Sequence, residues 1–228
     1  MSQQIPTTTF DFLRDLGENN NRDWFNAHKD RYQQALDTMI DFADELLGKV
    51  QQHDHIETPT GKKSLARIYR DVRFSKDKRP YKHYWMGGFR RATAKLRGGY
   101  YFHIEPGNTI VGGGFYSPNK EDLERIRREF EADASEIREI IADPTFQEFF
   151  GELRGDELKT APKGFDKNHP DIDLIRKKSF YVLRKISDDV VLSDRFVDVV
   201  DETFQALRPY FDYMSDVLTT DANGTPLV

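Results

Sequence analysis

The side chains of this sequence best suited to chemistry are a dense group of cations. Seven of them lie within sixteen positions: Arg67, Arg70, Arg73, Lys76, Lys78, Arg79 and Lys82. Guanidinium groups bind phosphate or carboxylate oxygens through paired hydrogen bonds, and ammonium groups add compact positive charge. The wider segment 62–97 holds thirteen Lys or Arg against Asp71 and Asp77, a net charge of +11 in a chain of net −5. This reversal of charge predicts an anion site, with phosphate the best-suited anion.

Neighbouring side chains suit the same kind of ligand. Tyr69 and Tyr81 could stack on a base or donate a hydroxyl, and Asp71 could orient a guanidinium group. The rest of the chain carries −16, however, so its acidic helices could also pair with these cations. The sequence therefore leaves two interpretations open, a ligand site and an internal network of ion pairs.

A second candidate group consists of His103 and Glu105. These residues are two positions apart in an expected strand, so both side chains point to one face, together with Tyr101. Imidazole and carboxylate groups serve as general bases and acids, which makes His103 and Glu105 the catalytic candidates. A metal centre would need a further ligand, and no residue spacing identifies one, so no metal site is predicted.

A third candidate is the glycine pair Gly113 and Gly114. The surrounding run GGG matches neither common nucleotide-binding glycine motif. Glycines inside a strand do indicate a close approach of the backbone, either to a ligand or to a packed helix. We expect a helix to begin at Ser117 with Pro118 in its first turn, and its free N–H groups would suit an anion.

The elements that position these residues follow from hydrophobic periodicity. Apolar residues three and four apart predict a long helix over 24–50 and shorter helices over 8–16, 117–141, 145–150 and 171–178. A last helix is expected from Ser193, divided or kinked at Pro209. Alternating residues predict strands over 65–74, 84–90, 99–105, 109–116 and 180–186. The first strand would place Arg67, Tyr69, Asp71 and Arg73 on one face, followed by a connecting loop.

These elements indicate the fold class. Helices that flank a mainly antiparallel sheet predict a single α+β domain over residues 1–228, with a flexible tail over 219–228. Cysteine is absent, which excludes disulfides, thiolate zinc sites and cysteine nucleophiles. The N-terminal residues lack the features of a signal peptide, and no apolar run approaches the roughly 18 residues of a membrane span. We therefore expect a cytoplasmic protein with no membrane partner, and its pI of 5.7 argues against a general DNA coater.

Five motifs carry a resemblance to a known family. They are NNRDWF (20–25), RIYRDVRFSKDKRPYK (67–82), YYFHIEPG (100–107), GGGFYSP (112–118) and PKGFDKNHP (162–170). By these motifs the chain resembles a bacterial family of uncharacterised proteins catalogued as domain of unknown function 2461, over about residues 8–215. The resemblance implies a fold and a functional region but no activity. His28 stands where the family pattern has Asn, and His83-Tyr84 where Thr-Asn is usual, so ligand preference could differ if these positions touch a ligand.

The sequence favours a protein with a cationic cleft that binds a phosphorylated or other anionic ligand. A phosphorylated small molecule or nucleotide is the favoured partner, and nucleic acid is less favoured. One alternative is a non-catalytic interaction module that uses the basic stripe to dock an acidic partner. A lesser alternative is a metal-dependent phosphodiester hydrolase, with Asp71 and Glu105 as conceivable metal ligands. No cofactor or oligomeric state is indicated, and the sequence does not decide whether the protein is an enzyme.

Overall fold

A computed structural model describes residues 4–221 and 224–227. The fold is α+β, with a four-stranded antiparallel sheet in the order β1–β2–β3–β4, as the sequence predicts. The strands are β1 (Trp85–Arg90), β2 (Gly99–Ile104), β3 (Thr109–Phe115) and β4 (Phe180–Ile186). All four fall where side-chain alternation predicts them. The chain divides into two compact units, and the sheet contributes residues to both.

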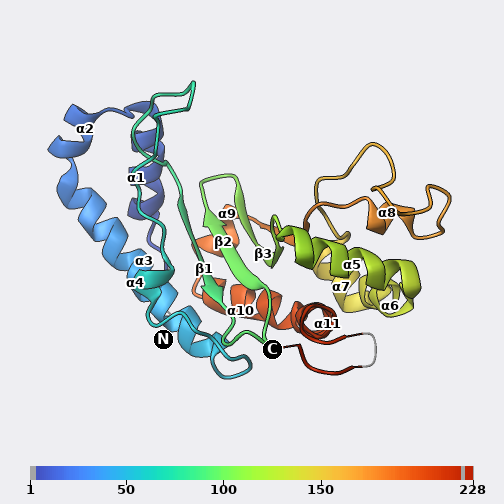
Figure 1. Cartoon of the computed structure of the whole chain (residues 1–228). Coiled ribbons are helices and arrows are strands. Elements are labelled where there is room, and N and C mark those ends of the chain that lie inside the picture. Colours follow the sequence, from blue (N-terminus) through green and yellow to red (C-terminus); the bar gives the residue numbers. More distant parts are fainter. Residues whose placement is uncertain (1–3, 222–223, 228) are drawn as a thin grey trace. The chain divides into compact units, whose positions relative to one another are not determined.

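The first unit comprises residues 4–89, 101–111 and 185–202. Its helices are α1 (Thr7–Glu18), α2 (Arg22–Ala27), α3 (Lys29–Val50), α4 (Gly61–Ser64), α9 (Asp188–Val191) and the first part of α10 (Phe196–Ala206). Helix α3 packs along α1 (Figure 1). The Phe42 ring of α3 lies edge-on to Phe102 at 5.6 Å and stacks on Phe196 at 5.1 Å. This aromatic packing forms the core of the unit.

The predicted single helix over 24–50 is wrong in one respect, because it is interrupted at His28. Asn21 caps α2 by accepting a hydrogen bond from the Trp24 N–H at 3.0 Å. His28 then leaves helical geometry at φ −119° and ψ 28°. Its ring stacks on Trp24 at 4.2 Å, and its Nδ1 lies 2.8 Å from the Trp24 carbonyl oxygen. This contact between a side chain and the backbone competes with regular helical hydrogen bonding.

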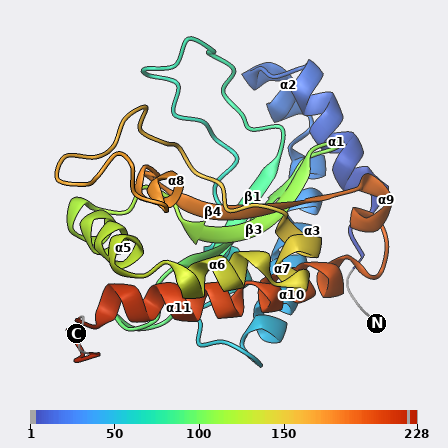
Figure 2. The same ribbon diagram turned by 90° about the vertical axis from the view of Figure 1, so that its right-hand side faces the viewer.

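The second unit comprises residues 90–100, 112–184, 203–221 and 224–227. Its helices are α5 (Lys120–Ala132), α6 (Ser135–Ala142), α7 (Pro144–Phe150), α8 (Ile172–Ile175) and α11 (Arg208–Thr219). Helix α11 packs against α5 and α6 (Figure 2). Phe130 contacts Phe180 with ring centres 5.9 Å apart. The buried Arg91 guanidinium donates to Asp212 at 2.5 Å and to the Ser215 hydroxyl at 3.2 Å.

The expected helix start at Ser117 is also wrong. The helix begins at Lys120 and is capped by Asn119, whose Oδ1 accepts from the Asp122 N–H at 2.9 Å. Ser117 instead has φ +53°, which lies outside the range of a right-handed helix. Asparagine is a strong cap, and two acidic residues in the first turn suit the helix dipole. The helix expected to reach residue 141 also ends earlier, at Ala132, and a separate helix, α6, begins at Ser135. Between them, Asp133 accepts a hydrogen bond from the Ser135 N–H at 2.8 Å.

The C-terminal helices divide near the predicted proline. Helix α10 begins at Phe196, and Pro209 lies in the first turn of α11, where a missing N–H is tolerated. Beyond α11, Thr220 pairs with Pro226, and the Leu227 N–H donates to the Thr219 carbonyl at 2.7 Å. Residues 222, 223 and 228 of the predicted tail lie outside the described residues.

The candidate glycines Gly113 and Gly114 are packed within the second unit. A Cβ at Gly113 would lie 2.6 Å from the Gly99 carbonyl oxygen and 2.9 Å from the Phe211 ring. A Cβ at Gly114, which has φ +143°, would lie 2.5 Å from the Tyr181 Cα. The neighbouring strands and α11 thus account for both glycines by close backbone packing.

Replacing Gly113 with Ala should lower the free energy of unfolding by about 1–3 kcal/mol, because the new methyl group meets a rigid backbone oxygen. Gly48→Ala is the opposite control. Gly48 lies in α3 with nothing within 4 Å of an added Cβ, so this change should stabilise by about 0.5–1 kcal/mol. Urea unfolding measures the free energy of unfolding of both variants. An unchanged value in Gly113→Ala would contradict the packing explanation.

Candidate functional site

The cationic segment folds as an irregular hairpin over residues 65–82, which we call the basic arm. Isolated bridges join Leu65 to Gly87 and Tyr69 to Tyr81. The Lys82 N–H also donates to the Ile68 carbonyl at 2.8 Å. Residues 71–79 form the tip, which extends beyond the paired part as a loop near α2 (Figure 1).

The prediction of a strand over 65–74 is therefore wrong, because this segment forms only isolated bridges, at Leu65 and Tyr69. Asp71 accepts from the Arg73 N–H at 3.2 Å, and Asp77 accepts from the Arg79 N–H at 3.0 Å. These local bonds turn the chain and replace the bonds of a strand ladder. Where pairing exists the predicted alternation holds, because Ile68 is buried while the side chains on either side of it, at positions 67 and 69, are exposed.

The return strand of the arm is anchored by Asn20. The Asn20 Nδ2 donates to the Tyr81 carbonyl at 3.0 Å, and the Tyr81 N–H donates to the Asn20 Oδ1 at 3.1 Å. The Tyr81 ring stacks on Phe25 of α2 at 4.0 Å, with the two planes only 14° apart. Tyr81 is 4% exposed, so its ring serves as the hydrophobic base of the arm.

Three of the arm's arginines are paired with its two aspartates. Asp77 lies 2.8 Å from both Arg79 and Arg70, and Asp71 lies 2.7 Å from Arg73. The bonds from Arg79 and then Arg70 hold the pKa of Asp77 well below its ordinary value, and Arg73 lowers the pKa of Asp71. The ion pairs are local to the arm, whereas the sequence-based alternative placed the partners on acidic helices.

The remaining cations of the arm have no carboxylate within ion-pair distance among the described residues. They are Arg67, Lys76, Lys78 and Lys82. Lys78 donates to the Val72 carbonyl at 3.0 Å, and Lys82 donates to the carbonyls of Arg67 and Tyr69 at 2.5 and 3.3 Å. Burial lowers the pKa of Lys82, and the nearby charges of Arg67 and Arg70 lower it further. Positive charge is thus concentrated beside the backbone of the arm without a compensating acid.

The second candidate group is a carboxylate shared by two histidines. Glu105 Oε2 lies 3.0 Å from His103 Nε2, as the shared strand face predicts, and Glu105 Oε1 lies 2.9 Å from His83 Nε2. Asn108 donates to the same carboxylate at 2.7 Å, and the Tyr101 hydroxyl lies 3.5 Å from His103 Nδ1. Burial acts to raise the pKa of Glu105, yet its bonds to Asn108 and His103 and the charges of both histidines hold it below its ordinary value.

This cluster can orient an imidazole for proton transfer. A carboxylate bound to one ring nitrogen fixes the tautomer and leaves the other nitrogen to act as a base. His83 is the more accessible of the two rings, with 35% of its side chain exposed against 12% for His103. Residue spacing does not predict His83 as a site residue, because only the fold brings it to Glu105, 22 positions further along the chain.

The two candidate groups are not joined by a direct contact. Within residues 4–221, no hydrogen bond, ion pair or ring contact joins the cations of the arm to the pair His103–Glu105. Within the same described residues, no three His, Asp or Glu side chains are grouped to hold a metal ion. Asp71 pairs with Arg73 while Glu105 pairs with histidines, so the geometry gives no support to a metal-dependent hydrolase.

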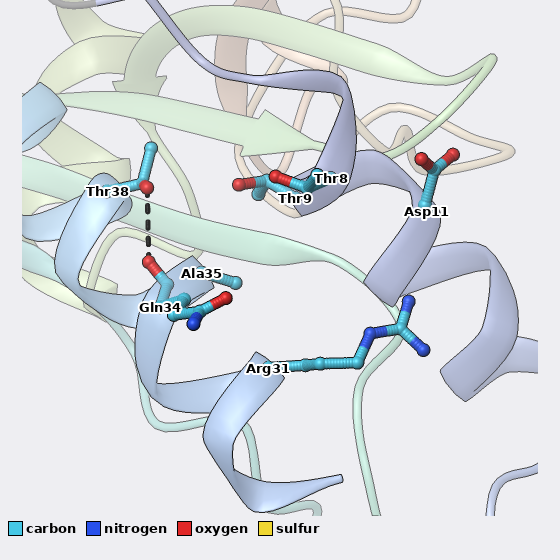
Figure 3. A pocket seen from close by; sticks show the side chains of 7 residues that line it. All are labelled: Thr8, Thr9, Asp11, Arg31, Gln34, Ala35 and Thr38. Atoms are coloured by element: carbon cyan, nitrogen blue, oxygen red, sulfur yellow. Dashed lines mark hydrogen bonds between the residues drawn. The ribbon is translucent and has the colours of Figure 1, made fainter.

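Two pockets are lined by residues that belong to neither group. One has a volume of about 240 Å³ and lies between α1 and α3 (Figure 3). It is lined by Thr8, Thr9, Asp11, Arg31, Gln34, Ala35 and Thr38. Its only cation, Arg31, already pairs with Asp15 at 2.8 Å. The other pocket, of about 460 Å³, lies beside α11 in the second unit, where Asp212 is paired with Arg91 and Arg208.

The fold and these groups define an α+β protein with an anchored cationic arm. A family model described as "Conserved hypothetical protein (DUF2461)" matches residues 8–213, so the chain belongs to this family, as its motifs indicate. No curated protein and no solved structure matches the chain. Among the described helices, none is both long and apolar enough to cross a bilayer.

Removing the amide of Asn20 should loosen the arm. Asn20→Ala should lower the free energy of unfolding by about 1–2 kcal/mol and speed hydrogen exchange at the Tyr81 amide, because both bonds of the anchor are lost. Asn26→Ala, at an exposed position of α2, is the control and should change neither. Unchanged exchange at Tyr81 in Asn20→Ala would show that the anchor is not needed.

Glu105→Gln should lower the free energy of unfolding by about 1–2 kcal/mol at neutral pH. Because the folded state lowers the pKa of Glu105, its stabilisation is fully present above the ordinary value of 4.5 and is lost as pH falls through the folded value. The difference between wild type and variant should therefore shrink in acid. Urea unfolding across this pH range tests it, with the exposed Glu57→Gln as control. A difference that stays constant into acid would contradict the assignment.

Proposed function

We propose that the basic arm binds a phosphorylated or other anionic ligand. The observation that carries this proposal is the imbalance of charge within the arm. Between residues 67 and 82 seven cations face two aspartates, a net charge of +5, and both aspartates are occupied by arginines. Four cations remain for an outside anion. Protein cations gathered without internal partners are costly unless solvent or a ligand compensates them.

The clearest binding group is the pair of Arg67 and Lys82. The Lys82 ammonium bonds to the carbonyl of Arg67, so the two charged residues belong to the same paired part of the arm. The Arg67 side chain is exposed, and its guanidinium makes no hydrogen bond or ion pair to other described residues, although the charge of Asp71 lies within electrostatic reach. A phosphate placed here would gain bidentate bonds from the guanidinium. It would also relieve the charge repulsion that, after burial, lowers the pKa of Lys82.

The competing proposal is a protein-interaction module that docks an acidic partner through the same cations. A small phosphate ligand distinguishes the two, because only a ligand site should bind it with measurable affinity and stabilise the folded chain. We place this function in the cytoplasm, in keeping with a chain that contains no cysteine. The cluster of His83, His103 and Glu105 is a separate candidate for proton transfer, for which no substrate site is assigned.

Arg67→Gln combined with Lys76→Gln should weaken binding of inorganic tripolyphosphate at least about tenfold, since each charge-assisted bond is worth about 1.5–3 kcal/mol. Both side chains are exposed and bond to no described group, so the melting temperature should change by no more than a few degrees. Isothermal titration calorimetry at low ionic strength measures the affinity.

The matched control is Lys120→Gln with Lys167→Gln, which removes the same charge from exposed positions of the second unit. This variant should bind as wild type does. Equal weakening in both variants would mean that only net charge matters. Absence of any binding to wild type would overturn the proposal and leave the protein-interaction module as the better explanation of the arm.

A further inference from the structure

The basic arm exposes two aromatic rings. Tyr69 is 52% exposed and Phe74 is 96% exposed, although large apolar side chains are normally buried. Both lie among the cations that have no carboxylate partner, with Arg67 two positions before Tyr69 and Lys76 two positions after Phe74. An exposed ring beside an unpaired cation on the same short arm is the arrangement that binds a flat, charged ligand.

Tyr69 is held in place as a platform. Its ring packs against Tyr81 at 5.4 Å and against Phe25 at 6.1 Å, and its backbone pairs with that of Tyr81. The Lys82 ammonium bonds to its carbonyl oxygen at 3.3 Å. Packing therefore fixes one side of the Tyr69 ring, while the other side faces solvent. The ring would lose little conformational entropy when a ligand binds.

Phe74 occupies the tip of the arm. Among the described residues its one ring contact is with the Arg73 guanidinium, 5.9 Å from the ring centre. Lys78 donates to the Val72 and Arg73 carbonyls, which holds the backbone on the N-terminal side of Phe74. The Phe74 ring thus points into solvent from a loop whose backbone is held by hydrogen bonds, and its surface is free to contact a ligand.

We propose that the anion bound by the arm carries a nucleobase. The inference rests on the proposed anion binding and names its ligand class: a nucleotide unit, either free or within a single strand. Bases stack on Tyr69 and Phe74, while phosphates bind Arg67 and Lys76. Stacking of a base on an aromatic ring contributes about 1–3 kcal/mol and tolerates any base, and the phosphates supply the salt-dependent part of the affinity.

An anionic lipid surface would also attract a cationic loop with an apolar tip. Two observations favour the nucleotide. The large exposed apolar side chains of the arm are both aromatic, with no exposed Leu, Ile or Trp among its described residues. Tyr69 lies in the paired part of the arm, packed on α2 through Phe25, rather than at the tip where insertion into a membrane would require it.

The test compares two labelled single strands of equal length, an oligothymidylate and an abasic phosphodiester, by fluorescence anisotropy. Wild type should bind the oligothymidylate at least about fivefold more tightly than the abasic strand. Phe74→Ala should remove most of that difference without weakening the abasic strand, and Phe74→Tyr should restore it. Tyr116→Ala removes an exposed ring of the second unit and should leave the difference intact.

Titrations with ATP and tripolyphosphate identify the source. If the affinity for ATP exceeds that for tripolyphosphate and equals that for the oligothymidylate, the ligand is a free nucleotide. If the oligothymidylate binds more tightly than ATP, the ligand is single-stranded nucleic acid. If wild type and Phe74→Ala both bind the two strands with equal affinity, the inference of a nucleobase is overturned. If tripolyphosphate still binds in that case, the proposed function stands. Loss of anionic-vesicle binding in Phe74→Ala, without discrimination between the strands, overturns it in favour of a lipid surface. If no phosphate compound binds, the proposed function fails as well.

Discussion

The arrangement of the candidate site depends on how Asn20 and Phe25 hold Tyr81. The Asn20 amide satisfies both backbone groups of Tyr81, and the Phe25 ring covers its side chain. An extended chain turns successive side chains to opposite sides. With Tyr81 fixed inward, Lys82 is directed to the backbone of the opposing segment, where it bonds to the carbonyl of Tyr69. The contacts of Asn20 and Phe25 with Tyr81 therefore hold the return strand of the arm, from which Lys82 bonds to the backbone of Tyr69.

The charged side chains of the arm are divided between ion pairs and cations without a carboxylate partner. Each aspartate of the arm bonds to the backbone N–H two residues later and pairs with the side chain of that same residue, so turn formation and charge pairing use the same carboxylates. Exposed pairs of this kind contribute little to stability and weaken with salt. Their structural effect is to occupy both acids of the arm. In the proposed function, the unpaired cations, rather than the arginines in pairs, are the groups that bind the outside anion.

The contrast between the two candidate groups shows what residue spacing can predict. His103 and Glu105 meet as expected, because a strand places side chains two positions apart on one face regardless of the rest of the fold. His83 could not be assigned to them, since its approach to Glu105 depends on how the segment after the arm lies beside β2. The strand expected over 65–74 failed for a related reason: side-chain alternation does not show whether a partner is there to pair with it, and beyond Arg70 the aspartates supplied turns instead.

The sequence by itself determined the α+β class, the four strands of the sheet, the family and the place of the cationic segment, because periodicity, motifs and charge are local properties. Tertiary structure decided which side chains remain available. It buried Tyr81, exposed Tyr69 and Phe74, and packed Gly113 against α11. It also separated paired from unpaired cations. Whether a side chain is buried or paired depends on neighbours that are distant in the sequence. The free energies of packing and desolvation decide which of these arrangements forms.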